Sequence, residues 1–385
     1  MTSRDNLRFQ AFRGVEGFER LAPEWRKFAE GMEGACFNHF PEWYRAYLSS
    51  LETDPDRVWF IAAYRGNALA GIFPLHFQNF GAIPFRPRVL GTIDDDQMQL
   101  SDFVFPQTAD NEHLFSALTQ WLRTQRIFRW DELRVRKVSA ESSIHYAARA
   151  RLPQATVPLK YYTSAYFNTA GTYAQATHAM TSKFKSNLRR RNRIAEETAP
   201  LRHQVYRREE LPAAFEVFLQ IEASGWKGES GTASAIRCQP AMYAFYSTLV
   251  REFGAWDACA IVILWHGDQA VAGQFCLQIR RTFYILKVGF SEAHAKFAPG
   301  VLLLERLLHD VCDDPNIDIL HLVNEPPWAA SFKPEITGVW SYFAPNWSVR
   351  GFLVHLGLLA KRWRDARIRD LSAKPVRPAI EQEAG

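Results

Sequence analysis

The segment from residue 282 to residue 310 carries residues suited to bind an anionic group at the start of a helix. Its sequence, TFYILKVGF followed by SEAHAKFA and PGVLLLERLLHD, predicts a strand, a loop and a helix that begins at Pro299 and Gly300. The first turn of a helix has backbone N–H groups without intrahelical partners, and these bind phosphate or pyrophosphate. His294 and Lys296 add positive charge just upstream. An ordinary strand-to-helix connection with proline at the first helical position gives the same pattern, so both interpretations stay open.

The basic stretch SKFKSNLRRRNR at residues 182–193 is a second candidate for anion binding. It contains six basic residues, which are Lys183, Lys185, Arg189, Arg190, Arg191 and Arg193. A helix cannot place all six on one face, so the stretch is more than a solvated stripe. A solvated charged helix, the phosphates of a cofactor, an anionic sugar or lipid, and RNA are the alternatives. The rest of the chain lacks matching basic density, which argues against nucleic acid.

Two further segments each combine an acid, a tryptophan and a lysine. The first is EASGWKG at the end of a predicted helix, with Glu222, Trp226 and Lys227. The second, HLVNEPPWAASFKPE, follows a predicted strand and holds Glu325, Trp328 and Lys333. Mobile loops of this kind close over substrates, and ligands of α/β sheets bind beyond the carboxyl ends of strands. For the first loop, a helix cap with a packed tryptophan is the structural alternative.

Composition and missing motifs exclude several classes of protein. The 385 residues are 47% hydrophobic and 23% charged, which predicts two ordinary folded domains. The net charge of +5 does not by itself indicate nucleic acid. A P-loop, a GxGxxG fingerprint and an HExxH motif are all missing, so P-loop kinases, simple dehydrogenases and zinc hydrolases are excluded and no metal site is expected. Five scattered cysteines and a polar N-terminus without an export signal predict a cytoplasmic protein.

A weak internal repeat in the sequence predicts duplicated domains. VWFIAAYRGNALAGIFPL and AIVILWHGDQAVAGQFCL each place an apolar strand, a glycine-containing turn and a second apolar strand in the same order. Helices are expected on both sides of each unit, over residues 37–51, 114–125, 173–197, 211–222, 242–253 and 299–313, with a last strand at 318–323. We therefore predict an α/β chain with domains at 1–160 and 161–350, followed by residues 351–385.

The second half resembles the GNAT-type acyltransferase domain of the CelD/BcsL family, found with bacterial polysaccharide loci. It also resembles the Fem-type aminoacyl transferases, which carry two GNAT domains in one chain. The matching stretches are SKFKSNLRRRNRIAEE, GWKG at 225–228, KVGFSEAHAKFAPGVLLLERLL and the pair Phe332-Lys333, and in the first half FNHFPEWYRAY and LSDF at 100–103. The resemblance covers most of residues 35–340. The extra residues EPPWAAS before Phe332 depart from the family's pattern.

The resemblance implies tandem GNAT-like domains, each a mixed, mostly antiparallel sheet flanked by helices. It also implies acetyl-CoA or a longer acyl-CoA as donor, with its pyrophosphate held by Ala295, Lys296, Phe297, Ala298, Pro299 and Gly300. A backbone N–H near Gly289 or Phe290 would stabilise the oxyanion. The candidate bases are Glu222, His294 and Asp102, in that order. The acceptor-site residues would be Trp226, Lys227, Glu325, Trp328 and Lys333, while Arg189 and Arg190 would hold phosphates or an anionic acceptor.

The expected function is acyl transfer from acyl-CoA to an amine or hydroxyl, with a sugar or polysaccharide precursor as acceptor and one active site per chain. A Fem-like transferase with an aminoacyl-tRNA donor and a non-catalytic binding module are the alternatives. Residues 352–371, FLVHLGLLAKRWRDARIRDL, predict a basic amphipathic helix. This helix either docks on the second domain or lies on an anionic membrane at the inner face, and a flexible tail is expected after Ser372.

Overall fold

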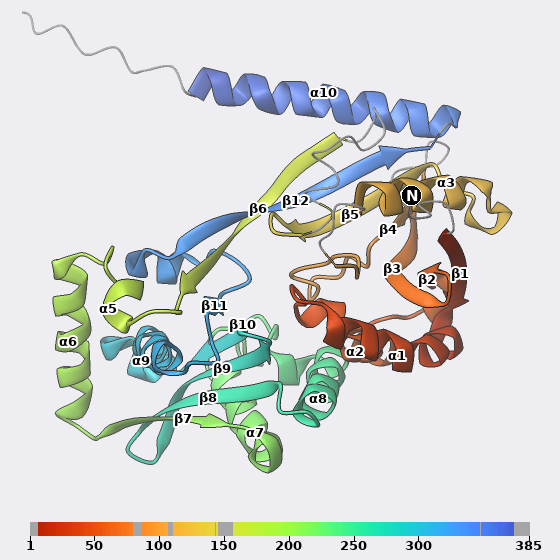
Figure 1. Ribbon diagram of the computed structural model, residues 1–385. Helices are drawn as coiled ribbons and strands as arrows, with labels where there is room; N and C mark the ends of the chain where they lie inside the picture. Colours follow the sequence, from red (N-terminus) through yellow and green to blue (C-terminus); the bar gives the residue numbers. More distant parts are fainter. Residues whose placement is uncertain are drawn as a thin grey trace, which may run out of the picture.

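One continuous sheet of twelve strands runs through the molecule (Figure 1). A computed structural model describes residues 7–79, 87–106, 111–142, 144, 157–346 and 348–372. The strand order is β1-β2-β3-β4-β5-β12-β6-β11-β10-β9-β8-β7. Helices flank this sheet, and most neighbouring strands are antiparallel. The predicted class, a mixed and mostly antiparallel α/β fold, is confirmed.

The first half of the sheet is built by residues 7–139. Its elements are β1 (Leu7–Arg13), α1 (Gly14–Gly31), α2 (Pro41–Ser50), β2 (Val58–Arg65), β3 (Ala68–Asn79), β4 (Arg88–Gly91), α3 (Asn111–Thr124) and β5 (Glu132–Ser139). Strands β2 and β3 form the predicted hairpin, in which Gly66 adopts a φ of 62° at the turn. Such a left-handed backbone is inexpensive only for glycine, which explains the residue at this position.

The second half repeats the plan. Its elements are β6 (Val157–Asn168), α5 (Tyr173–Ala176), α6 (Ser182–Glu196), β7 (Leu201–Tyr206), α7 (Leu211–Glu222), α8 (Pro240–Gly254), β8 (Cys259–His266), β9 (Gln269–Ile279), β10 (Thr282–Phe290), α9 (Pro299–Asp313), β11 (Ile319–His321), β12 (Glu335–Pro345) and α10 (Val349–Ser372). The predicted helix at 173–197 is two helices, because Thr172 and Thr181 cap separate helix starts with their hydroxyls. Helix α9 begins and ends where the sequence predicts.

The two halves are related by their strand order, which reads the same from both edges of the sheet. Strands β1 to β5 correspond to β7 to β11, and each half contains one parallel pair, β4 with β5 and β10 with β11. The sequence similarity between the β2–β3 and β8–β9 hairpins is therefore explained by their equivalent positions in the two halves. The sixth strands are exchanged: β6 pairs with β11, whereas β12 returns to pair with β5.

The exchanged strands β6 and β12 also pair with each other and join the halves. The predicted boundary between residues 160 and 161 falls inside β6, and the division into domains there stays a prediction. The hydrophobic core also continues from one half into the other, where helices pack against the sheet. Phe37 meets Tyr284 at 5.1 Å between ring centroids, and Trp43 meets Phe245 at 5.3 Å. Because these rings are buried, the apolar interior is shared between the halves.

The C-terminal helix α10 begins against the first half. Ser348 Oγ donates to Asp131 Oδ1 at 2.9 Å, and the helix then runs along β12 and β6 (Figure 1). The helix therefore contacts both the strands β12 and β6 and the first-half residue Asp131, so its docking extends beyond the expected second domain. In the described part of the chain, no helix is long and apolar enough to cross a membrane. The tail expected to be flexible, 373–385, lies outside the described residues.

Candidate functional site

A gap opens in the second half where strands β10 and β11 separate. They pair only from Thr282 to Tyr284, after which no strand of the described residues pairs with β10 on that side. The carbonyl of Val288 accepts a hydrogen bond from Lys227 Nζ at 3.4 Å instead of from a strand partner. A cavity of about 140 Å³ lies between the end of β10 and α9, lined by Gly273, Gln274, Val288, Gly289, Phe290, Ala298, Gly300, Val301, Leu303 and Trp328.

The free edge of β10 presents backbone N–H groups to this gap. Ser291 N donates to Val271 O at 2.8 Å, on the side of β9. Because backbone groups alternate along a strand, the N–H of Gly289 also faces β9, and that of Phe290 faces the opposite edge. Of the two backbone donors proposed from sequence, the strand geometry therefore favours Phe290.

The start of α9 borders the same cavity. Ala298 adopts a left-handed φ of 51° immediately before Pro299, and no side chain caps the helix. The first turn contains no acidic residue, so its positive end is not neutralised there. A Cβ added to Gly300 would lie 3.7 Å from the Phe290 ring, an ordinary contact, which shows that the helix start and the end of β10 face each other.

Gln274 is a buried polar side chain that sequence reasoning missed. It lines the cavity from β9 and is 1% exposed. Among the described residues, no donor lies within hydrogen-bond distance of its Oε1. An unpaired buried carbonyl is costly, so a ligand N–H or O–H entering the cavity would be favoured there. The available signal was a lone glutamine inside the apolar run AVAGQFCL.

A second cavity, of about 260 Å³, adjoins the first across the end of β10. Its lining includes Glu222, Gly225, Trp226, Lys227 and Glu292, together with Val288, Gly289, Phe290 and Trp328, which are shared with the first cavity. Lys227 Nζ lies 3.3 Å from Glu222 Oε1, and the N–H of Ile236 donates to Glu222 Oε2 at 2.9 Å. The acid, tryptophan and lysine predicted on this loop are thus brought together beside the gap.

Close packing of α7 on β10 places Glu222 at this point. A Cβ on Gly289 would lie 2.7 Å from Glu222 Cα, closer than carbon atoms approach in proteins. Glycine is therefore required at residue 289 for the helix end to reach the strand. The buried carboxylate of Glu222 is positioned by backbone packing as well as by its hydrogen bonds.

Lys287 is a second residue that sequence reasoning missed. It follows a bulge in β10 between Ile285 and Lys287, and such irregularities redirect side chains near sites. Its Nζ lies 5.7 Å from the centre of the Tyr246 ring. Burial lowers the pKa of this ammonium, and the charge of Lys227 lowers it further, against the attraction of Glu222. The lone lysine in TFYILKVGF was its sequence signal.

The other two candidate bases line neither cavity. His294 is half-buried, with Nδ1 3.0 Å from Ser291 Oγ and its ring against Phe297; burial and the neighbouring His266 lower its pKa. Asp102 is buried 3.6 Å from His39 Nε2. Although burial alone would lower it, the pKa of His39 is raised to about 10 by Cys36 and Asp102. Asp102 is therefore paired with His39 inside the first half.

Glu325, Lys333, Arg189 and Arg190, predicted to bind the acceptor or phosphates, line neither of the two cavities. Glu325 lines a groove of about 460 Å³ between the halves and accepts a hydrogen bond from Thr163 Oγ1. Lys333 is exposed in a left-handed conformation before β12. Arg189 and Arg190 are exposed on α6, which contacts the 3-10 helix Glu292–Phe297 preceding α9. Neither arginine belongs to the lining of the two cavities.

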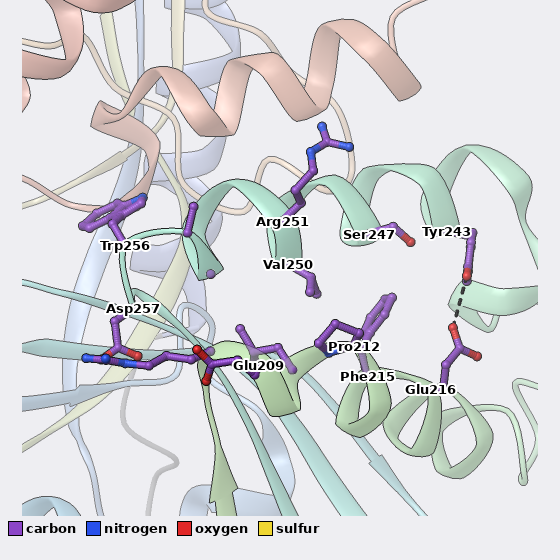
Figure 2. Close-up of a pocket in the computed structure, with 14 residues that line it drawn as sticks. Glu209, Pro212, Phe215, Glu216, Tyr243, Ser247, Val250, Arg251, Trp256 and Asp257 are labelled. Atoms are coloured by element: carbon purple, nitrogen blue, oxygen red, sulfur yellow. Dashed lines mark hydrogen bonds and ion pairs between the residues drawn. The ribbon is translucent and has the colours of Figure 1, made fainter.

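A larger hollow of the described surface lies elsewhere. A groove of about 890 Å³ runs between α7 and α8, where Tyr243 Oη donates to Glu216 Oε1 at 3.1 Å (Figure 2). It is lined by Phe215, Val250, Arg251 and Trp256, among others, and by none of the residues predicted to act in catalysis or binding. The candidate site is therefore the pair of smaller cavities at the end of β10, which contain residues predicted from the sequence.

The sequence of residues 182–325 matches the acetyltransferase (GNAT) domain family. This part of the chain, termed the GNAT domain here, is similar to GNAT-type acyltransferase domains. This stretch begins at α6 and ends after β11, so the GNAT domain contains both cavities apart from Trp328. No curated protein matches the sequence of the chain.

Comparison with solved structures finds similarity over nearly the whole chain. FemX is 8% identical with a TM-score of 0.57, and the match covers 88% of this chain and 97% of FemX. A tandem GNAT protein from the clavulanic acid biosynthesis pathway is 12% identical with a TM-score of 0.42, covering 88% and 98%. L-PGS from Bacillus licheniformis is 12% identical with a TM-score of 0.49, covering 90% and 97%. At 8% identity, the likeness to FemX concerns the fold alone.

Proposed function

We propose that the GNAT domain transfers an acyl group from acyl-CoA to an amine or hydroxyl acceptor. The observation that carries this proposal is the gap between β10 and β11, with the uncapped start of α9 beside it. The residues present fit the donor. A pantetheine arm bears amide N–H groups that suit the unpaired carbonyl of Gln274, and a pyrophosphate suits the first turn of α9.

In this proposal, each part of the donor site has its own task. Gly300 leaves room for phosphate oxygens at the helix start, and Lys296 and Arg189 supply positive charge around it. The bound donor supplies a thioester, which is already activated toward acyl transfer. The N–H of Phe290 is placed to donate to the acyl oxygen as negative charge develops there.

The acceptor would occupy the second cavity. Glu222 is the proton acceptor for its amine or hydroxyl, and Lys227 holds that carboxylate in place at 3.3 Å. Trp226 and Trp328 are 57% and 36% exposed at the cavity, so flat apolar rings stand beside charged groups. A sugar ring has apolar C–H faces and polar hydroxyl edges, which supports a sugar or polysaccharide precursor as acceptor.

Calorimetric titration with acetyl-CoA and longer acyl-CoAs tests the donor. Micromolar binding is expected for the wild type and loss of binding for Gly300→Glu, which places bulk and negative charge at the helix start. Gly34→Glu is the matched control, because a side chain at Gly34 would meet no atom within 4 Å. Absence of acyl-CoA binding by the wild type would overturn the proposal and favour a non-catalytic module or another donor.

A Fem-like transferase with an aminoacyl-tRNA donor is the second candidate. The exposure of Lys183, Arg189 and Arg190 favours it, because these side chains give a cationic surface to α6, a helix that contacts the 3-10 helix before α9. This candidate predicts tRNA binding that weakens steeply between 50 and 200 mM salt. Binding of acyl-CoA without binding of tRNA in a filter assay would exclude it.

A further inference from the structure

The described part of helix α10 has two apolar faces, one less exposed and the other strongly exposed. The inner face is less exposed and includes Gly351, Val354 and Leu358. At Gly351 the helix is so close to the junction that a Cβ would lie 2.5 Å from the carbonyl oxygen of Asp131. This contact fixes how the helix is rotated on the molecule, so the opposite face must point outward.

The outward face carries a continuous apolar stripe. Its side chains are 41% to 80% exposed and belong to Val349, Phe352, Leu353, Leu356, Leu359 and Trp363. At 100° per residue these positions fall within an arc of about 120°. Scattered apolar residues are normal on a surface, but a stripe along four turns of one helix indicates an interaction site.

The charge of α10 indicates what covers the stripe. Residues 349–364 include Arg350, Lys361, Arg362 and Arg364 and contain no aspartate or glutamate. Two copies of the chain meeting through this face would bring like charges together. An anionic lipid surface would instead attract the basic residues and accept the apolar side chains at the boundary of headgroups and acyl chains.

We propose that the outer face of α10 binds peripherally to an anionic lipid bilayer, with the helix lying in the plane of the membrane surface. The inner face stays on the sheet, so the folded chain is carried to the membrane as a whole. Figure 1 shows α10 along one side of the molecule, with α7 and α8 on the side away from it. The inference is independent of the proposed acyl transfer.

Co-sedimentation of the full chain with vesicles tests this assignment. We expect binding to phosphatidylcholine vesicles containing 30% phosphatidylglycerol, at least tenfold weaker binding to pure phosphatidylcholine, and weakening by 500 mM salt. The double variant Phe352→Glu/Leu356→Glu should lose at least tenfold in affinity. Val15→Glu/Ile127→Glu is the matched control, because it adds the same charge at exposed apolar side chains elsewhere.

Light scattering after size-exclusion chromatography tests the alternative that a second copy of the chain covers the stripe. A dimer that Phe352→Glu/Leu356→Glu dissociates, or equal binding of the wild type to neutral and anionic vesicles, would overturn the proposal. Should that variant lose its circular dichroism signal, Leu353→Ser/Leu359→Ser replaces it. The salt titration of the wild type tests the electrostatic part without any variant.

Discussion

Lys227 Nζ lies 3.3 Å from the Oε1 atom of Glu222, and both side chains border the cavity at the end of β10. The pair holds a buried carboxylate next to the backbone of β10, where the proposed acceptor would meet the acyl group. The other oxygen of Glu222 accepts a hydrogen bond from the N–H of Ile236. One oxygen is therefore bound to the backbone of the following loop, and the other faces Lys227.

We expect Glu222→Gln to lower kcat by about 10²-fold or more, because the amide keeps the shape and the hydrogen bond to Ile236 but is not a proton acceptor. The affinity for acyl-CoA should change little, since the donor cavity does not include this residue. Steady-state kinetics and calorimetry measure the two quantities. Glu216→Gln on the same helix is the control, and equal losses in both variants would refute a special role for Glu222.

Gln274→Met should weaken acyl-CoA binding by about five- to tenfold, the worth of about one hydrogen bond. The same change should leave the free energy of unfolding equal or about 1 kcal/mol higher, because it removes an unpaired buried carbonyl at similar volume. Calorimetry and urea unfolding give both values. Gln269→Met, exposed at the start of the same strand, serves as control; unchanged donor affinity in Gln274→Met would show that the donor does not use this carbonyl.

Gly289→Ala should lower the free energy of unfolding by about 1–3 kcal/mol, because the added methyl overlaps the backbone of Glu222. Since the overlap moves the end of α7, kcat should fall as well. Gly357→Ala is the comparison within α10, where a Cβ meets nothing within 4 Å, and alanine there should be neutral or stabilising. A stable and fully active Gly289→Ala enzyme would contradict the close approach described above.

His321 should make the protein sensitive to acid. It is buried in β11 between Tyr166 and Tyr284, and burial lowers its pKa to about 4. In the unfolded chain His321 takes up a proton below pH 6.5, whereas in the folded protein it stays neutral down to about pH 4. The free energy of unfolding is therefore highest above pH 6.5 and decreases as the pH falls from 6.5 to 4. The loss amounts to about 3 kcal/mol.

His321→Asn should remove this part of the pH dependence, because asparagine can accept the N–H of Val323 as Nδ1 of His321 does. Urea unfolding between pH 4 and pH 7 measures the effect. His113→Asn changes an exposed histidine and should follow the wild-type curve. Parallel curves for the wild type and His321→Asn would show that the ring is protonated in the folded state.

Cutting the chain at the sequence-predicted boundary should yield a first fragment, 1–160, that does not fold alone. It lacks β12, the partner of β5, and exposes Phe37 and Trp43 that pack on the second half. Co-expression with 161–385 should restore a soluble complex. Circular dichroism and size-exclusion chromatography decide the outcome, and a folded, monomeric 1–160 fragment would establish an autonomous domain.

Local signals predicted much of the fold and part of the site. The turn at Gly66, the start of α9 at Pro299 and the loop with Glu222 and Lys227 all follow from short sequence patterns. The exchange of β6 and β12 could not be predicted, because strand pairing between distant segments leaves no local pattern. Gln274 was missed because a single polar residue in an apolar strand gains its meaning only from the cavity beside it. Lys287 was missed because its burial near Tyr246, Lys227 and Glu222 depends on contacts between distant segments.

The pairing of β12 with β6, from Glu335 to Phe343, removes the hinge that two separate domains would have. A hinge motion that separated the halves would have to break the backbone hydrogen bonds between β12 and β6 in the middle of the sheet. A ligand must therefore enter through openings that already exist or through movement of the segment after Glu222. For a long glycan, this favours approach from the side, with its end inserted beside Trp226 and the rest of the chain left in solvent.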